Sequence, residues 1–262
     1  MIGVKPRGLK LHNIKLAIIT INYNDGHGLK KTCKSVYEQN LKGVEHIIVD
    51  GASTDLTSEI LAKYEVLGSK IICEPDNGIY DAMNKGVQTA KAEYISFLNS
   101  GDEFCHKGVV EEIIKFIDLF DLDNPAAFYV NKIYSDELGN VVRVWKPGEF
   151  QRFKYFLGWM TPHQSTVIAK QFYDRFGLFK TNYKIAADYE LMFRFFFKYK
   201  ITPQYIDLNI VRMKAGGLSN KSLTNVIESN FEVLKSWQEN GFVPPIWIFF
   251  TKPLSKIRQY FQ

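Results

Sequence analysis

The chain has 262 residues, of which 46% are hydrophobic and 23% are charged, values that are ordinary for a globular protein. This length suits one large α/β domain or two small ones, and it allows a sizeable core. The formal net charge of +5 is too small to indicate a nucleic-acid partner, and no zinc-finger, basic-zipper or RNA-binding motif accompanies it. It suits an anionic substrate or an anionic membrane surface.

Targeting and redox signals are sparse. Residues 1–13 carry basic side chains without an apolar stretch, so we expect no signal peptide. No run of about 18 apolar residues occurs, which argues against a membrane-spanning helix. Cys33, Cys73 and Cys105 lack the spacing of a metal site, and we expect reduced thiols in a cytosolic protein.

The first hundred residues alternate between short apolar runs and stretches with helical spacing. Strands are predicted over residues 15–22, 45–51, 69–74 and 93–99, and helices over 28–39, 53–64 and 78–90. In this interpretation Ser53 or Thr54 is the N-cap of the second helix. Continuous apolar strands that alternate with helices predict an α/β fold with a mainly parallel, Rossmann-like sheet covered by helices on both faces.

The pattern changes after Phe104. We predict a helix over 107–119, a hairpin around 137–139, a loop over 161–177, a helix over 188–200, a strand over 203–213 and added C-terminal helical structure from about 222. No Pro/Gly-rich linker interrupts the chain. We therefore expect one catalytic domain over 1–220, with a nucleotide-binding half (15–104) and an acceptor half (105–220), followed by a helical, aromatic and basic tail (221–262).

Polar residues follow each of the four predicted strands. Thr20–Asp25 ends the first strand, Asp50 and Gly51 end the second, Glu74 and Asp76 follow the third, and Asp102 follows the fourth. Such residues can simply form turns. Their gathering at the carboxyl edge of one sheet favours a nucleotide site instead. Neither glycine-rich phosphate loop follows the first strand, so a metal ion or basic side chains must neutralise phosphate charge.

Four segments together resemble the family-2 glycosyltransferases of GT-A fold, including those of bacterial surface-polysaccharide assembly. They are Ala17–Gln39, Ile47–Asp55, Glu74–Gly86 and Phe97–Phe104, and a looser likeness continues to about Ser219. The resemblance implies a site for a nucleoside-diphosphate sugar. The donor-binding residues that it implies are Thr20, Asn22, Tyr23, Asp50, Ser53, Asp76, Gly78, Asn84, Lys85, Ser100 and Gly101. The family often has Arg where this chain has Met83, so we expect Lys85 or a metal to neutralise phosphate.

The segment Asn99–Asp102 aligns with the metal-binding Asp-x-Asp motif of that family. Asp102 takes the place of the last acid, and Ser100 replaces the first. One carboxylate, with diphosphate oxygens and waters, can hold Mg²⁺ or Mn²⁺. The resemblance therefore implies a divalent cation at Asp102, and the alternative is that Asp102 only ends a strand.

The second half offers candidates for proton transfer. The resemblance makes Asp188 the general base and Glu190 the fallback, although Ala187 replaces the first acid of the family's pair and acids are favoured at helix starts in any case. It also places a sugar and acceptor pocket before the base. The residues expected there are Trp159, His163, Gln164 and Glu190.

The tail Pro244–Phe261 combines aromatic and aliphatic residues with Lys252, Lys256 and Arg258 and has no acid. This composition favours contact with an anionic bilayer, and the alternative is docking on the domain or on another subunit. We also expect Lys214–Asn220 to form either a loop over the diphosphate or a plain turn.

Taken together, these patterns predict an inverting glycosyltransferase. It would move a sugar, most often from UDP, to a hydroxyl of a lipid-linked or oligosaccharide acceptor, at the inner face of a bacterial plasma membrane. A sugar-phosphate nucleotidyltransferase would want an Arg-containing loop after the first strand, which is absent here. A catalytically inactive sugar-nucleotide-binding subunit remains the alternative. The donor sugar, its nucleotide, the linkage and the oligomeric state stay open.

Overall fold

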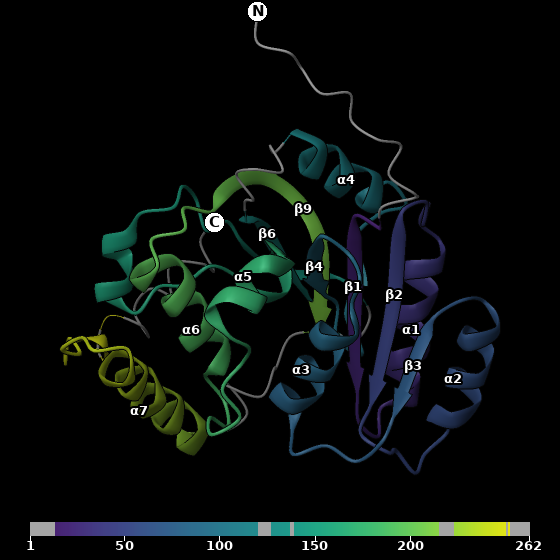
Figure 1. Cartoon of the computed structure of the whole chain (residues 1–262), viewed down its shortest axis with the longest axis horizontal. Coiled ribbons are helices and arrows are strands. Elements are labelled where there is room, and N and C mark those ends of the chain that lie inside the picture. Colours follow the sequence, from purple (N-terminus) through teal and green to yellow (C-terminus); the bar gives the residue numbers. More distant parts are fainter. Residues whose placement is uncertain (1–13, 120–126, 137–138, 215–222, 250, 252–262) are drawn as a thin grey trace, which may run out of the picture.

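The computed structural model describes residues 14–119, 127–136, 139–214, 223–249 and 251. Its first part is a four-stranded parallel sheet in the order β3-β2-β1-β4 (Figure 1). The strands are β1 (Leu16–Asn22), β2 (Val44–Asp50), β3 (Lys70–Cys73) and β4 (Tyr94–Phe97). The parallel pairing predicted from the sequence is confirmed for these strands, and it brings their carboxyl ends to one edge.

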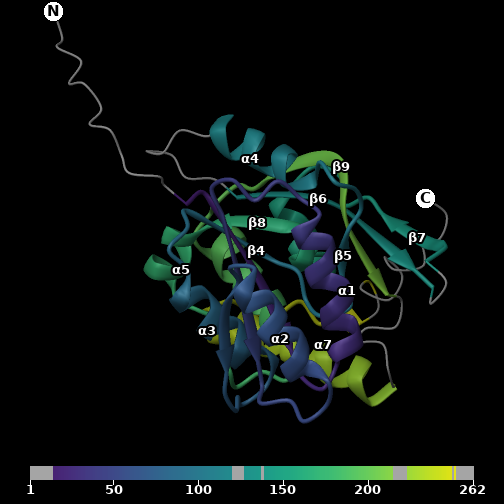
Figure 2. The same cartoon turned by 90° about the vertical axis from the view of Figure 1, so that its right-hand side faces the viewer.

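Helices cover both faces of this sheet, as predicted. They are α1 (Gly26–Tyr37), α2 (Thr57–Val66) and α3 (Ile79–Thr89), and Figure 2 shows α1 and α2 side by side. Successive side chains of a strand point to opposite faces. Ile48 accordingly packs against α1 and α2, whereas Ile47 and Val49 share a core with α3. The N-cap of α2 is Leu56, and not Ser53 or Thr54 as predicted.

The second part extends the same sheet with mixed pairing. The order continues β4-β8-β6-β9-β5, and β7 pairs with β6. These strands are β5 (Glu103–Phe104), β6 (Ala127–Ser135), β7 (Val141–Trp145), β8 (Thr166–Ala169) and β9 (Gln204–Lys214), with α4 (Val109–Leu119) packed nearby. β8 joins β4 and β6 antiparallel to both, and β9 runs parallel to β6.

The prediction of a loop over residues 161–177 is wrong. This segment holds the short helix η2 (His163–Ser165), then β8, then α5 (Lys170–Phe176). β8 has only four residues, too few to show a period, but Val167 and Ile168 are buried and β-branched side chains suit a strand. The strand places η2 against the end of β4.

Helices of the second half share one aromatic core with the sheet. They are η1 (Arg152–Leu157), α6 (Ala187–Met192), the π-helical η3 (Phe193–Lys198) and α7 (Leu223–Glu239). Val233 and Trp237 of α7 are buried in the same cluster as Tyr189 and Phe193. The helix after residue 222 therefore packs into the same core as the second half of the sheet. Residues 215–222 and 252–262, which hold most of the predicted loop and the end of the predicted tail, lie outside the described residues.

Across the described ranges, no helix combines the length and apolarity needed to cross a bilayer.

Candidate active site

Asp50, at the end of β2, organises the loops at the carboxyl edge of the sheet. Its carboxylate accepts hydrogen bonds from the Ser53 backbone N–H (2.8 Å), the Ser53 hydroxyl (2.6 Å) and the Asn22 amide (2.7 Å). Asp50 and Asn22 are buried, and they are partners in the β1–β2 register. The structure thus brings three predicted donor residues together in one network that fixes both loops.

Tyr23 and Asp76 both lie close to the Gly51 backbone beside this network, and we call these three residues the Gly51 slot. A methyl group added to Gly51 would lie 2.6 Å from Asp76 Oδ2 and 3.0 Å from Tyr23 Cδ2. Tyr23 exposes two thirds of its surface, and Asp76 is fixed by the Gly78 N–H, which donates to its other oxygen at 2.8 Å. An exposed ring opposite a carboxylate, with bare backbone between them, can stack a planar base and accept its ring N–H. These three residues therefore provide the elements of a base-binding slot.

Three predicted donor residues have other partners in the structure. Thr20 is fully buried, and its hydroxyl lies 3.0 Å from His46 Nε2 inside the sheet layer. Asn84 donates to the Phe179 carbonyl and accepts from the Phe179 N–H, both at 2.9 Å, so it ties α3 to the second half. Lys85 lies 2.9 Å from Glu74 and donates to the Pro75 carbonyl. Thr20 and Asn84 therefore have structural partners, and their predicted contact with a donor stays a prediction.

Ser100, which replaces an expected acid, lies beside a carboxylate from another strand end. Its hydroxyl lies 3.0 Å from Asp25 Oδ2, and Asp25 also accepts from the Gly28 N–H at the start of α1. Gly101 adopts a φ of 87°, a left-handed conformation that suits glycine. An acid at position 100 would face Asp25 and repel it, whereas a serine draws the Asp25 carboxylate toward this loop.

Asp102 belongs to a buried polar group that joins both halves of the sheet. Its Oδ2 is buried and has no hydrogen-bond partner among the described residues. Burial raises the Asp102 pKa to about 7, although the nearby ammonium groups of Lys132 and Lys31 oppose that shift. Lys132 of β6 is itself 5% exposed and donates to Gln164 Oε1 at 2.6 Å. Lys132 carries no signal of a site residue in the sequence, because a lysine in a strand ordinarily points to solvent.

His163 completes this buried group. Its ring packs between Phe97 and Phe179, with ring centroids 5.1 and 5.4 Å away, and its Nε2 has no partner among the residues that the structure describes. Burial and the charge of Lys132 lower the His163 pKa to about 3, so the ring is neutral near pH 7. Asp102, Lys132, Gln164 and His163 therefore form one polar cluster whose groups can bind hydroxyl or phosphate oxygens.

The donor set fits a divalent cation only if a ligand contributes oxygens. No group of three His, Cys, Asp or Glu side chains in the described part of the chain could hold a metal alone. The buried, unpartnered Oδ2 of Asp102 is nevertheless a suitable oxygen donor. Mg²⁺ is commonly bound by one or two carboxylates together with substrate phosphates. The residues thus fit a metal that binds along with a nucleoside diphosphate.

Asp188 is in the first turn of α6 and faces the donor half through α3. The Tyr80 hydroxyl of α3 donates to the Ile185 carbonyl at 2.6 Å, just before α6. The charge of Asp188 contributes to raising the Tyr80 pKa, so the two side chains are close. The segment before Asp188 is held by Glu232 of α7, whose carboxylate accepts from the N–H groups of residues 184, 185 and 186 at 2.6 to 3.0 Å.

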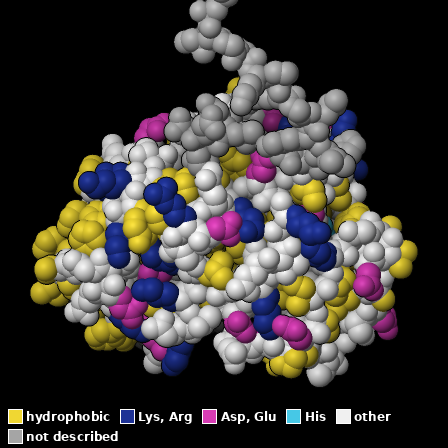
Figure 3. All heavy atoms as spheres, viewed as in Figure 1, with side chains coloured by type: hydrophobic (Ala, Val, Ile, Leu, Met, Phe, Trp, Pro, Cys, Tyr) yellow, Lys and Arg dark blue, Asp and Glu magenta, His cyan; other side chains and the backbone are white. Residues whose placement is uncertain are grey.

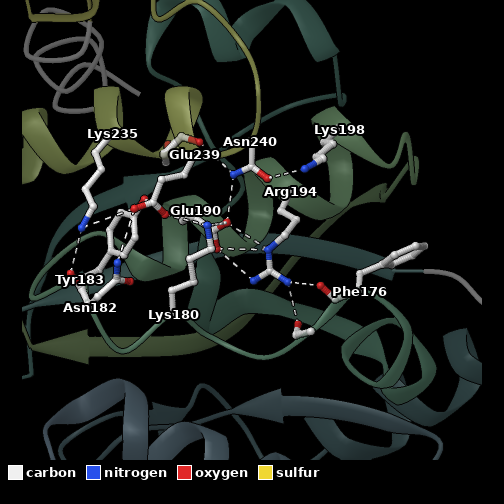
Figure 4. Close-up of polar contacts among 12 residues, drawn as sticks. Phe176, Lys180, Asn182, Tyr183, Glu190, Arg194, Lys198, Lys235, Glu239 and Asn240 are labelled. Atoms are coloured by element: carbon white, nitrogen blue, oxygen red, sulfur yellow. Dashed lines mark hydrogen bonds and ion pairs between the residues drawn. The ribbon is translucent and has the colours of Figure 1, made fainter.

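Glu190 has charged and polar partners inside the protein, and its predicted contact with a sugar or an acceptor stays a prediction. It is fully buried, and Figure 4 shows its carboxylate bound by Arg194, Lys180 and Asn240. Arg194 also donates to the carbonyls of Phe176, Gly177 and Leu178. Cationic partners and hydrogen bonds of this kind offset the cost of burying the carboxylate and fix its position. Glu190 therefore anchors α6 and the loop after α5, and Asp188 is left as the candidate base.

Trp159 is partly buried and packs against the aromatic core. Its ring is near those of Tyr129, Phe150 and Tyr155, at centroid distances of 6.1 to 6.3 Å, and the Lys154 ammonium is 5.2 Å from its centroid. Trp159 is partly buried by these neighbours, and no described contact links it to Asp102 or Asp188. Its predicted contact with a sugar stays a prediction.

The chain is similar in sequence to known proteins. Residues 17–181 match the model of glycosyl transferase family 2. An uncharacterized glycosyltransferase of Mycobacterium tuberculosis (strain ATCC 25618 / H37Rv) is 32% identical over 184 residues, 68% of each chain. A PGL/p-HBAD biosynthesis glycosyltransferase of Mycobacterium bovis (strain BCG / Pasteur 1173P2) is 25% identical over 208 residues, 78% of each chain.

Solved structures confirm the expected GT-A fold. S. aureus TarS 1–349 superposes with a TM-score of 0.66 at 16% identity, over 90% of this chain and 70% of that one. The mannosyltransferase PcManGT of Pyrobaculum calidifontis, in complex with GDP-Man and Mn²⁺, gives 0.64 at 15% identity, over 92% and 69%. At these identities the likeness concerns the fold alone.

Proposed function

The chain belongs to glycosyl transferase family 2, and from this premise we propose that it is an inverting enzyme that transfers a sugar from a UDP-sugar to a hydroxyl acceptor in surface-polysaccharide biosynthesis. The observation that carries the proposal is the convergence of three features at one sheet edge. They are the slot at Tyr23, Gly51 and Asp76, the buried Asp102, and Asp188 facing α3. A binding subunit without catalysis would need the first two of these but not the third.

In the proposed reaction, Asp188 accepts the proton of the acceptor hydroxyl. The acceptor oxygen forms a bond to the anomeric carbon of the donor sugar, on the face opposite the nucleotide. The bond from that carbon to the diphosphate oxygen breaks, and UDP leaves with the electron pair. Glu232 and Tyr80 keep Asp188 in place through the backbone of residues 184–186.

A divalent cation, Mn²⁺ or Mg²⁺, would supply Lewis-acid stabilisation of the leaving diphosphate, with Asp102 as its protein ligand. PcManGT, which shares the fold, was solved with GDP-Man and Mn²⁺. Lys132 lies close enough to Asp102 to influence its pKa, and its fixed positive charge would add to the binding of phosphate or sugar oxygens. Lys85, paired with Glu74, would need to leave that partner to reach phosphate.

The proposed donor nucleotide and acceptor rest on proteins of similar fold and sequence. TarS 1–349 was also solved with UDP-GlcNAc, at a TM-score of 0.60 and 16% identity over 80% of this chain and 61% of that one. We take UDP as the nucleotide and a lipid-linked or oligosaccharide hydroxyl as the acceptor. The slot at Gly51 supports a planar base opposite a carboxylate, which a uracil ring N–H can use.

The test is a thermal-shift series with UDP, GDP, CMP and TDP, each with and without Mn²⁺. At about 100 times its Kd, a ligand adds roughly 2.7 kcal/mol to the free energy of unfolding, which is easily seen. We expect UDP with Mn²⁺ to stabilise the wild type, and Asp102→Ala to lose the part that depends on Mn²⁺. Asp174→Ala is the matched control, because Asp174 is an exposed acid paired only with Lys170 among described contacts.

Three outcomes would contradict the proposal. Stabilisation by UDP that is equal with and without Mn²⁺ would remove Asp102 from metal binding. Binding of a UDP-sugar without any release of UDP, in the presence of acceptor extracts, would favour the inactive subunit. If no nucleotide stabilises the protein, the donor site itself is wrong.

A further inference from the structure

An exposed apolar surface, separate from the candidate active site, is formed by two segments far apart in the sequence. One is η1, and the other is the segment that follows α7. Its members, which we call the apolar face, are Phe153, Phe156, Leu157, Val243, Ile246 and Trp247, and each is more than two fifths exposed. Figure 3 shows hydrophobic side chains gathered at its left-hand edge, over η1 and the end of α7.

Defined contacts hold the two segments side by side. The Trp247 indole N–H donates to the Phe156 carbonyl at 2.8 Å, and the Thr251 hydroxyl donates to the Leu157 carbonyl at 3.0 Å. Ile248 is fully buried between them and the core. Phe156 packs on Trp237 with ring centroids 5.0 Å apart. The apolar face is therefore a built surface, whose exposed rings are supported from below.

The two segments that form the apolar face are basic in sequence. Arg152–Leu157 contains Arg152 and Lys154 and no acid. The sequence from Pro244 on has no acid either, and its basic residues Lys252, Lys256 and Arg258 lie outside the described residues. The neighbouring groove along α7 differs, because Glu228 and Glu232 line it together with Ile227 and Phe231. A protein partner could suit either surface, whereas an anionic bilayer suits only the basic one.

We propose that the apolar face rests in the interface of an anionic lipid bilayer, with η1 and the segment after α7 inserting together. Tryptophan and phenylalanine beside lysine and arginine are the residues that favour this depth of a membrane. The proposal extends the tail expected from the sequence to η1, 90 residues earlier in the chain. It does not depend on glycosyl transfer, which is measured separately as release of UDP in solution without lipid.

The experiment is flotation of the full-length chain with vesicles. We expect binding to vesicles of phosphatidylcholine mixed with phosphatidylglycerol, weaker binding to phosphatidylcholine alone, and a decrease with added salt. Phe153→Ser and Ile246→Ser should each weaken binding about tenfold, because each removes one exposed apolar side chain from insertion. Val66→Ser is the matched control, since Val66 is 88% exposed but lies on α2 in the donor half.

Clear results would overturn the proposal. Equal binding by Phe153→Ser and wild type would show that η1 does not contact the bilayer. Absence of binding to anionic vesicles would exclude membrane binding altogether. A wild type that elutes as a dimer and an Ile246→Ser variant that elutes as a monomer, both without vesicle binding, would assign the face to a second copy. Unchanged melting temperatures of the variants show that they fold, and Val243→Ser offers a further site with little packing to lose.

Discussion

The donor edge and the region around Asp188 are built in different ways. At the donor edge, polar side chains are fixed by partners on the same or neighbouring loops, as Asp50 is by Ser53 and Asp25 is by Gly28. Around Asp188, the backbone is fixed by Glu232, 46 to 48 residues away in sequence, and by Tyr80, 105 residues away from Ile185. Turn chemistry therefore shapes the binding slot, whereas tertiary packing positions the candidate base.

The largest effect is expected from Asp188→Asn, which tests whether that distant packing serves catalysis. The asparagine keeps an oxygen for the Tyr189 N–H, which donates to Asp188 Oδ1 at 2.8 Å, but it cannot take a proton. We expect kcat to fall by about 10³-fold, within the range for loss of a general base, with donor binding retained. Transfer to acceptor and thermal shift with UDP measure the two. Full activity would exclude Asp188 as the base.

The next largest effect tests how Asp188 is positioned without changing its ability to accept a proton. Glu232→Gln keeps the shape of the side chain but loses the charge that holds three N–H groups before α6. A hydrogen bond to a charged group contributes roughly 1.5–3 kcal/mol, so we expect kcat to fall about tenfold with the KM for donor unchanged. Glu239→Gln is the control, because Glu239 binds Lys180 and Tyr183 and not this segment. An unchanged kcat would show that α7 does not position Asp188.

Gly51→Ala tests the locally built side of the comparison. Its methyl group would meet the Asp76 carboxylate and the Tyr23 ring, so the slot must narrow or its walls must separate. We expect the Kd for UDP to rise about tenfold while the kcat at saturating donor stays close to that of the wild type. Gly108→Ala is the control, since its nearest neighbour would be His106 at 3.5 Å, an ordinary contact. Unchanged UDP affinity would show that the uracil base does not bind beside Gly51.

The same contrast explains what the sequence could predict. The parallel sheet and the loops at Asp50, Asp76 and Ser100 are encoded in short stretches, where strand period and turn residues lie next to each other. Glu190, in contrast, reads like any acid at a helix start, and only the fold shows that it pairs with Arg194 and Asn240. Lys132 likewise belongs to the site only because the fold brings β6 beside η2. Contacts of this kind have no local signal.

The smallest effect concerns stability at low pH and compares two buried histidines. Burial lowers the pKa of both His46 and His163 to about 3, from 6.5. Below pH 6.5 the unfolded chain binds protons at these rings that the folded protein does not bind, so stability is lost as pH falls from about 6.5 toward 3. Each ring contributes about 1.4 kcal/mol of this loss for every pH unit below that of the unfolded ring.

His46→Gln should show how much of this pH dependence comes from His46, which lies in the donor half. His46 lies within hydrogen-bond distance of Thr20 (3.0 Å) and Ser69 (2.9 Å), so glutamine lowers stability at pH 7 through imperfect replacement. Between pH 6 and pH 4, roughly, its free energy of unfolding should nevertheless decline less steeply than that of the wild type, by about one proton in the linkage slope. Urea unfolding across this range measures the slope. An unchanged slope would mean that His46 titrates normally, and that burial within the parallel sheet does not hold it neutral.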